Sequence, residues 1–151
     1  MNHTFDFSKP IAIGCDHAGF EYKEMTKIYL QQKGMKVIDM GTHSTTSVDY
    51  PDFAHAVAEK VELGEACCGI LFCGSANGVA ITANKHQHVR AGLSWENDVA
   101  RLIRQHNNAN VICIPARFVA VHLALEMIEN FLTTDFEGGR HGLRVDKIAC
   151  S

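Results

Sequence analysis

Five short apolar runs alternate along the chain with longer stretches in which apolar residues recur at helical spacing. The runs are rich in valine, isoleucine, leucine and cysteine and end in glycine or polar residues, as strands buried on both faces of a parallel sheet do. They cover residues 10–16, 35–41, 68–74, 89–95 and 110–116. The pattern predicts five parallel strands.

The stretches between these runs predict helices. Phe53, Val57 and Val61 share one helical face, and the same spacing recurs in residues 99–106 and 121–131. Repeated strand–helix–strand units favour a sheet covered on both faces, with right-handed crossovers and ligands bound at the carboxyl ends of the strands. We therefore expect the α/β class, as a Rossmann-like three-layer α/β/α sandwich around a five-stranded parallel sheet.

Composition indicates an ordinary globular chain. Its 151 residues are enough for one domain, 1–151, with a full hydrophobic core. Hydrophobic residues make up 46%, charged residues 21%, and the net charge is −3. This balance gives no electrostatic reason to expect nucleic acid or a membrane as partner, so we expect a small molecule.

The chain reads as a cytoplasmic protein. It contains no run of 18 apolar residues, and its start, MNHTFDFSKP, lacks the basic and hydrophobic regions of a secretory signal. Its six cysteines lie mostly inside or at the ends of apolar runs. That placement suits reduced thiols that pack in a core better than a disulfide framework.

Polar residues follow the first predicted strand. Asp16 and His17 stand directly before a probable helix. Asp16 suits the N-cap position, where aspartate is preferred, and capping is the alternative to a role in a binding site. His17 carries little weight on its own.

Cys73 ends the third predicted strand and precedes a stretch of helical spacing. The turn between them consists of Gly74, Ser75, Ala76, Asn77 and Gly78. Such a turn can aim several backbone N–H groups at one point and so bind negative charge. The helix dipole lowers the pKa of a nearby thiol, so we expect Cys73 to favour the thiolate if it is partly exposed. The alternative is a packing residue, because free cysteine is often buried.

Other glycine-loop functions do not fit. The chain has no GxxxxGK[ST] sequence, and the third glycine of a dinucleotide-binding motif is missing. A cysteine phosphatase of the C-x5-R type needs an arginine six positions after its cysteine. Val79 and Glu21 stand at that spacing from Cys73 and Cys15.

Two further groups of residues are candidates for the site. His106 and Asn107 end a predicted helix before the fifth strand, where the helix C-terminus favours a protonated imidazole suited to a general acid. The alternative for His106 is a half-buried ring bonded to backbone. Arg117, Arg140 and Arg144 are either solvated or a clamp for phosphate.

The HQH sequence at residues 86–88 hints at a metal. It lacks a third ligand at a plausible spacing, so we expect no metal site there.

Five motifs together resemble the sugar-phosphate isomerase family that includes ribose-5-phosphate isomerase B and the galactose 6-phosphate and allose 6-phosphate isomerases. They are GCDHAGF, DYPDFA, GILFCGSANGVAITANK, RQHNNANV and EGGRHGLRV, in the family's order and spacing. The family loop is commonly CG[ST]GxG, whereas Ala76 and Asn77 stand at its centre here. A left-handed backbone at Ala76 would be strained.

The resemblance implies a cofactor-free enzyme of the pentose phosphate pathway that interconverts ribose 5-phosphate and ribulose 5-phosphate through an enediolate, with no metal, as a homodimer or dimer of dimers. It makes Cys73 the base and His106 the acid that opens the furanose ring, with Ser75 and Asp16 as further catalytic residues. The substrate-binding residues that it implies are Asp16, His17, Tyr50, Gly74, Ser75, Ala76, Asn77, Gly78, Asn107, Arg117, Arg140 and Arg144. Some of the arginines are expected from the neighbouring subunit.

Two alternatives stay open. The substrate can be a six-carbon sugar phosphate, allose 6-phosphate or galactose 6-phosphate, because a pocket discriminates one extra carbon by only about 1–3 kcal/mol. The chain can also be a non-catalytic sugar-phosphate sensor, since a fold does not establish activity. A sensor, however, has no need for a thiol and an imidazole together.

Overall fold

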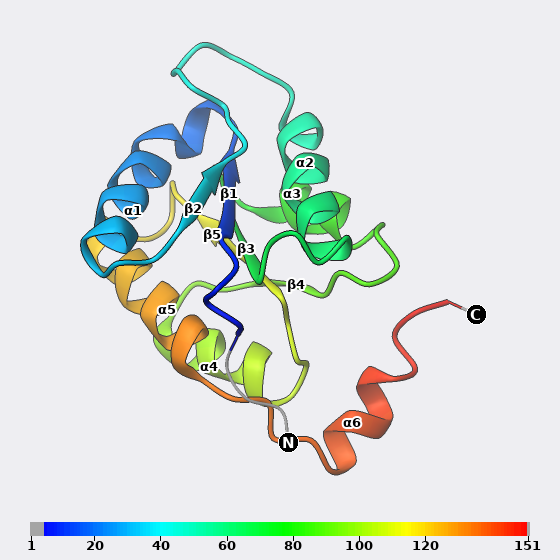
Figure 1. Cartoon of the computed structure of the whole chain (residues 1–151). Coiled ribbons are helices and arrows are strands. Elements are labelled where there is room, and N and C mark those ends of the chain that lie inside the picture. Colours follow the sequence, from blue (N-terminus) through cyan, green and yellow to red (C-terminus); the bar gives the residue numbers. More distant parts are fainter. Residues whose placement is uncertain (1–4, 151) are drawn as a thin grey trace.

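The computed structural model describes residues 5–150, and these contain a five-stranded, all-parallel sheet (Figure 1). The first four residues and Ser151 lie outside this range. Both ends of the expected 1–151 domain, and the start of the N-terminus predicted to be non-secretory, therefore lie outside the described residues. The sheet order is β2-β1-β3-β5-β4. The strands are β1 (Ile11–Cys15), β2 (Val37–Asp39), β3 (Cys68–Cys73), β4 (Ala91–Leu93) and β5 (Val111–Pro115). Each lies within a predicted run.

Helices occupy the stretches between the strands. The elements are the 3-10 turn η1 (His17–Gly19), α1 (Phe20–Gln32), α2 (Tyr50–Glu62), α3 (Asn77–Ala83), α4 (Asn97–Gln105), α5 (Val121–Thr133) and α6 (Arg140–Val145). Across residues 5–150, every helix is too short or too polar to cross a membrane. The three amphipathic stretches predicted from periodicity are α2, α4 and α5.

The direction of each crossover decides which face a helix covers. The chain moves one way along the sheet from β1 to β2 and from β4 to β5, and the other way from β2 to β3 and from β3 to β4. Right-handed connections therefore place α1 and α4 on one face and α2 and α3 on the other. The hydrophobic core divides accordingly, with Leu30, Ala100 and Phe131 in one cluster and Ala58 and Val79 in the other. The predicted three-layer sandwich is confirmed.

The three central strands are apolar on both sides because both faces are covered. Every residue of β1, β3 and β5 is buried, whereas the edge strands β2 and β4 are half-buried. All six cysteines are free thiols, and four of them are buried, which fits the reduced packing thiols expected from the sequence.

The strand order leaves a crevice at the ends of β1 and β3. These strands are neighbours, but the chain leaves them in opposite directions, so neither connection covers the space between their carboxyl ends. In the parallel register Cys15 pairs with Phe72. Asp16 therefore emerges beside Cys73, and the fold itself joins the first two candidate motifs.

A buried ion cluster fastens α1 to the edge strand β2. Lys23 is fully buried, and its Nζ lies 2.6 Å from Asp39 Oδ2 and 2.9 Å from Glu24 Oε2. Lys27 Nζ lies 2.7 Å from the same Asp39 oxygen. Burial alone would raise the pKa of Asp39. The hydrogen bonds from Lys23, Lys27 and the Gly41 N–H outweigh it, so the pKa lies below its ordinary value of 3.8.

Replacing Asp39 by asparagine should lower the free energy of unfolding at pH 7 by about 3 kcal/mol. This is the low end of the range for breaking a buried ion pair, because Glu24 still contacts Lys23. A carboxylate whose pKa is lower in the folded chain than in the unfolded chain stabilises the fold at pH values above the unfolded-state pKa. This stabilisation is lost as the pH falls through the folded-state pKa. Urea unfolding should therefore show the difference at pH 7 and a smaller one at pH 3.

The matched control is Asp146→Asn, at an exposed carboxyl after α6. Equal unfolding free energies for Asp39→Asn and the unchanged chain at pH 7 would show that the ion cluster contributes nothing.

Candidate active site

A pocket of about 480 Å³ opens at the carboxyl ends of β1, β3 and β5. It lies where the strand order leaves the sheet uncovered. Its lining is Asp16, His17, Ala18, Cys73, Gly74, Ser75, Arg117 and Phe118. Six of these eight residues are candidates from the sequence, and they come from three separate strand ends. Ala18 and Phe118 were not predicted, because neither carries a chemical group that marks a site.

Asp16 caps η1 and also contacts Cys73. Its Oδ1 accepts hydrogen bonds from the backbone N–H groups of Ala18 (3.0 Å) and Gly19 (3.2 Å), which confirms the predicted N-cap. Its other oxygen, Oδ2, lies 3.4 Å from Cys73 Sγ and accepts the thiol hydrogen. Capping therefore fixes the carboxylate in place and leaves one oxygen facing the sulfur.

The expected low pKa of Cys73 is wrong. Burial raises the pKa of this thiol above its ordinary value, and the negative charge and hydrogen-bonding of Asp16 raise it further. The backbone N–H groups of Ala76 and Gly74 lower it, but by less. Cys73 is only 8% exposed, so the condition of partial exposure is not met. At neutral pH the side chain is a thiol directed at a carboxylate.

The loop after Cys73 has the strained backbone expected from the sequence. Ala76 adopts a left-handed conformation, with φ 63° and ψ 1°, at the N-cap of α3. This conformation costs an alanine about 1–2 kcal/mol. The turn it makes allows the backbone N–H groups of Gly74 and Ala76 to face the sulfur. Ser75 Oγ lies 3.4 Å from the N–H nitrogen of Asn77, which holds the loop closed.

His17 is oriented by the main chain of a distant loop. Its Nδ1 accepts a hydrogen bond of 3.2 Å from the backbone N–H of Val48. A neutral ring then carries its proton on Nε2, which makes that nitrogen a donor. The sequence did not reveal this contact, because a backbone donor 31 residues away leaves no side-chain pattern.

Tyr50 and Arg117 pack against the loop. The ring of Tyr50, at the start of α2, lies so close to Gly78 that an added Cβ there would be 2.4 Å from a ring carbon. Arg117 lies along Gly74 and donates its backbone N–H to the Gly74 carbonyl at 3.1 Å. Among the residues predicted to bind substrate, four lie beside the pocket without lining it. They are Tyr50, Ala76, Asn77 and Gly78.

The remaining predicted site residues are not brought to this pocket within one chain. The helix α4 runs back from the carboxyl end of β4, so its C-cap His106 lies at the amino edge of the sheet, next to the start of β5. The six residues of β3 separate the two edges by roughly 16 Å at about 3.3 Å per residue. His106 and Cys73 therefore belong to different cavities.

The second cavity has a volume of about 340 Å³. Its lining is His106, Asn107, His141, Arg144, Val145 and Ile148. Arg140 lies in the same helix, α6, one turn before Arg144, as predicted for a helical tail. His141 was not predicted. Its ring stacks on that of His106 at 4.2 Å between centroids and 11° between planes.

The histidines of the HQH sequence contact residues of α2. His86 Nε2 lies 2.8 Å from His55 Nδ1, and His86 Nδ1 lies 3.0 Å from Glu62 Oε2. His88 contributes its backbone N–H to Glu62, at 3.1 Å. The two histidines of the motif thus contact Glu62 through different groups, His86 through its ring and His88 through its backbone.

Replacing Asp16 by asparagine should lower the pKa of the Cys73 thiol toward its ordinary value of 9.0, because it removes the adjacent negative charge. Asparagine also caps helices well, so the turn at η1 should persist. The rate of Cys73 alkylation by iodoacetamide can be followed on its peptide by mass spectrometry. As the pH is increased, this rate should begin to rise at a lower pH in the variant than in the unchanged chain. Cys67, the residue before β3, is the internal control. An unchanged Cys73 profile would contradict the coupling.

Comparison with known proteins agrees with this geometry. The family model of ribose/galactose isomerases matches residues 11–148. The chain is 44% identical over 140 residues to ribose-5-phosphate isomerase B of Escherichia coli, covering 93% of this chain and 94% of that one. It is similar to the crystal structure of a ribose 5-phosphate isomerase from Thermotoga maritima, with a TM-score of 0.91, 48% identity and coverage of 93% and 97%.

A third relative was solved with a sugar phosphate. Ribose-5-phosphate isomerase B from Mycoplasma genitalium, with bound ribulose-5-phosphate, matches with a TM-score of 0.91 and 41% identity over 95% of each chain. The match to the family model extends from the first strand to beyond α6. This chain therefore belongs to the ribose/galactose isomerase family.

Proposed function

We propose that this chain is an aldose–ketose isomerase that interconverts ribose 5-phosphate and ribulose 5-phosphate without a cofactor. The relatives with this name, one of them holding ribulose-5-phosphate, support the substrate. The observation that carries the proposal is the contact of 3.4 Å between Cys73 Sγ and Asp16 Oδ2 in a pocket at the strand ends. This contact places the thiol that would remove a proton from carbon beside a carboxylate that can accept the thiol's own proton.

Proton transfer begins with the thiol of Cys73. Because its pKa is raised, the thiol must lose its proton before it can act, and the carboxylate of Asp16 accepts it. The thiolate then removes the proton from C2 of the open-chain aldose and returns it to C1. The hydroxyl proton moves from O2 to O1, and Ser75 is the hydroxyl in the pocket placed to relay it.

The loop stabilises the charge that develops on the substrate. As the proton leaves C2, negative charge accumulates on the enediolate oxygens, and fixed donors there are worth about 2.7–4 kcal/mol each in a comparable site. The backbone N–H groups of Gly74 and Ala76 already face the sulfur. His17, with its donor on Nε2, suits a hydroxyl or oxyanion of the sugar.

Arg117 is the phosphate ligand that this pocket supplies. A guanidinium binds phosphate with paired hydrogen bonds. The other residues proposed for the phosphate and for ring opening, Arg140, Arg144 and His106, lie at the opposite edge of the sheet. A second copy of the chain, paired about a two-fold axis, would bring its amino edge against this carboxyl edge and complete the site.

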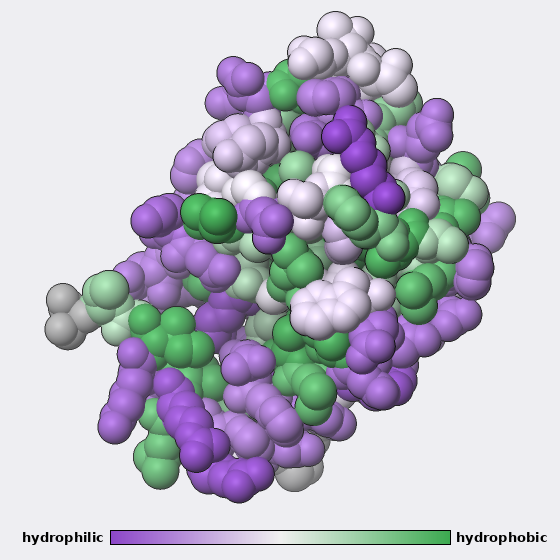
Figure 2. All heavy atoms as spheres, turned by 180° about the vertical axis from the view of Figure 1, so that it is seen from behind, coloured by the Kyte–Doolittle hydropathy of each residue, from purple (hydrophilic) through white to green (hydrophobic). Residues whose placement is uncertain are grey.

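The exposed apolar surface supports such a homodimer. Leu143 of α6 is 70% exposed and Phe118, which lines the Cys73 pocket, is 76% exposed. Figure 2 shows hydrophobic side chains in the open across the rear face and on the segment at its lower left, where α6 lies. A groove of about 340 Å³, lined in part by Ile103 and Ile148, separates the residues after α6 from the β4 edge.

A cytoplasmic location, in which thiols stay reduced, suits this chemistry.

Replacing Cys73 by alanine should lower kcat for ribose 5-phosphate about 10²–10⁴-fold, the usual effect of losing a proton-transferring group. Binding of ribulose 5-phosphate, measured by calorimetry, should stay within a few-fold. Cys67→Ala, the same change at the residue before β3, is the control and should keep full activity. Binding without turnover in the unchanged chain would identify a sensor. Faster turnover of allose 6-phosphate or galactose 6-phosphate would assign a six-carbon substrate.

Mixing two inactive variants tests the shared site. Cys73→Ala and His106→Ala should each be inactive as pure dimers. After co-expression, random pairing makes half of the dimers mixed, each with one intact site of two, so about a quarter of normal activity should return. A mixture as inactive as its parents would show that both residues must come from the same chain.

A further inference from the structure

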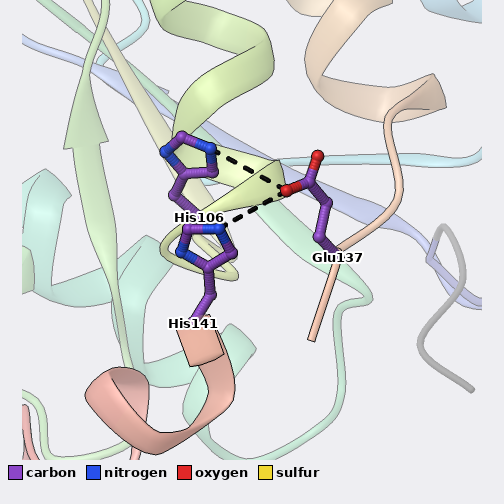
Figure 3. A group of neighbouring side chains, drawn as sticks. All are labelled: His106, Glu137 and His141. Carbon is purple, nitrogen blue, oxygen red and sulfur yellow. Dashed lines mark ion pairs between the residues drawn. The ribbon is translucent and has the colours of Figure 1, made fainter. Parts of the chain in front are cut away.

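Three side chains outside the Cys73 pocket converge on one point (Figure 3). They are His106 at the end of α4, Glu137 in the segment before α6, and His141 in the first turn of α6. Glu137 Oε1 lies 3.4 Å from His141 Nε2 and 3.9 Å from His106 Nε2. In the part of the chain that the structure describes, this is the only group of three such side chains whose ligand atoms all lie within 4.8 Å of one another.

The backbone holds the three groups together. The N–H of Glu137 donates to the carbonyl of Gln105, the residue before His106, at 3.1 Å. Gly138 and Gly139 then turn the chain with positive φ angles of 70° and 55°, which returns His141 to the same place. Few residues other than glycine adopt two such angles in succession. The convergence is thus built into the fold of the tail.

Ordinary hydrogen bonding does not account for this arrangement. The ring of His141 stacks nearly parallel on that of His106, with both Nε2 atoms directed at the same carboxylate oxygen (Figure 3). The distance of 3.9 Å from His106 to Glu137 is too long for a hydrogen bond. Within residues 5–150, the two imidazoles stack on each other, and each is joined to Glu137 by an ion-pair distance.

The geometry points to a Zn²⁺ site formed by His106, Glu137 and His141, whose occupation inhibits the enzyme by removing His106 from ring opening. Two imidazoles and one carboxylate are a common zinc donor set, with water in the fourth position. Bonds of about 2.0–2.1 Å place tetrahedral ligand atoms roughly 3.3 Å apart. His141 and Glu137 already have that separation, whereas the ring of His106, which is 41% exposed, must turn out of its stack on His141 so that the ion lies in the plane of both rings.

The site is open to an ion from solvent. The side chains of His106 and Glu137 are 41% and 50% exposed, whereas that of His141 is 10% exposed and fixed. Mg²⁺ and Ca²⁺ prefer sets of oxygen ligands, so the nitrogen donors select a transition metal. The metal would also join the end of α4 to α6, and so hold the tail that carries Arg140 and Arg144. The inhibition, but not the binding, rests on the proposed function.

Calorimetric titration of the chelator-treated full chain with Zn²⁺ tests the site. We expect one metal per chain, with affinity at least about tenfold weaker in Glu137→Gln and His141→Ala. His55→Ala, at an exposed histidine of the other histidine cluster, and Cys73→Ala control for binding elsewhere and should leave this affinity unchanged. Unaltered binding in Glu137→Gln and His141→Ala, or loss of binding in Cys73→Ala, would overturn the proposal.

Activity supplies the second readout. Glu137→Gln should keep the basal isomerase rate and resist a Zn²⁺ concentration that halves the rate of the unchanged chain. Equal inhibition of both would place the inhibitory metal elsewhere and overturn the regulatory claim. If the unchanged chain has no isomerase activity, the proposed function fails, and the calorimetry alone decides whether the metal site exists.

Discussion

A carboxylate held by two backbone N–H groups and set 3.4 Å from a thiol is the contact on which the proposed chemistry of this chain depends. Asp16 cannot turn away from Cys73 without giving up the cap of η1. The same carboxylate raises the pKa of the thiol and accepts its hydrogen. Burial thus keeps Cys73 protonated in the resting chain, and the proton acceptor that activates it is already in place.

Sheet topology decides the remainder of the site. In a parallel α/β sheet, strand ends point to one edge and crossover helices end at the other. Cys73 follows a strand, whereas His106 follows a helix, so one chain separates them by the length of the sheet. In the proposed homodimer, two copies facing each other edge to edge would remove that separation. The exposed apolar residues of α6 and the open groove beside the β4 edge are consistent with this pairing.

Much of the fold follows from the sequence because buried parallel strands must be apolar on both faces. The runs that contain β1, β3 and β5 show this directly, and the cap at Asp16 follows from a local preference. The position of β5 between β3 and β4 does not follow, since no local pattern encodes strand order.

The errors at the site have the same origin. The raised pKa of Cys73 depends on burial and on Asp16, 57 residues away, and a local helix-dipole argument contains neither. The stacking of His141 on His106 depends on a turn at Gly138 and Gly139 that is visible only once the tail is folded back. The sequence predicts which residues carry reactive groups, whereas the burial and the charges around those groups depend on the folded chain.

Proton NMR of ribose 5-phosphate incubated with the protein in deuterated water tests the central claim most directly. If a thiol that exchanges with solvent carries the proton between carbons, ribulose 5-phosphate should form with deuterium at C1. The Cys73→Ala variant should form almost no deuterated ketose in the same time, and deuterated ketose formed by that variant at the unchanged rate would contradict the role of Cys73.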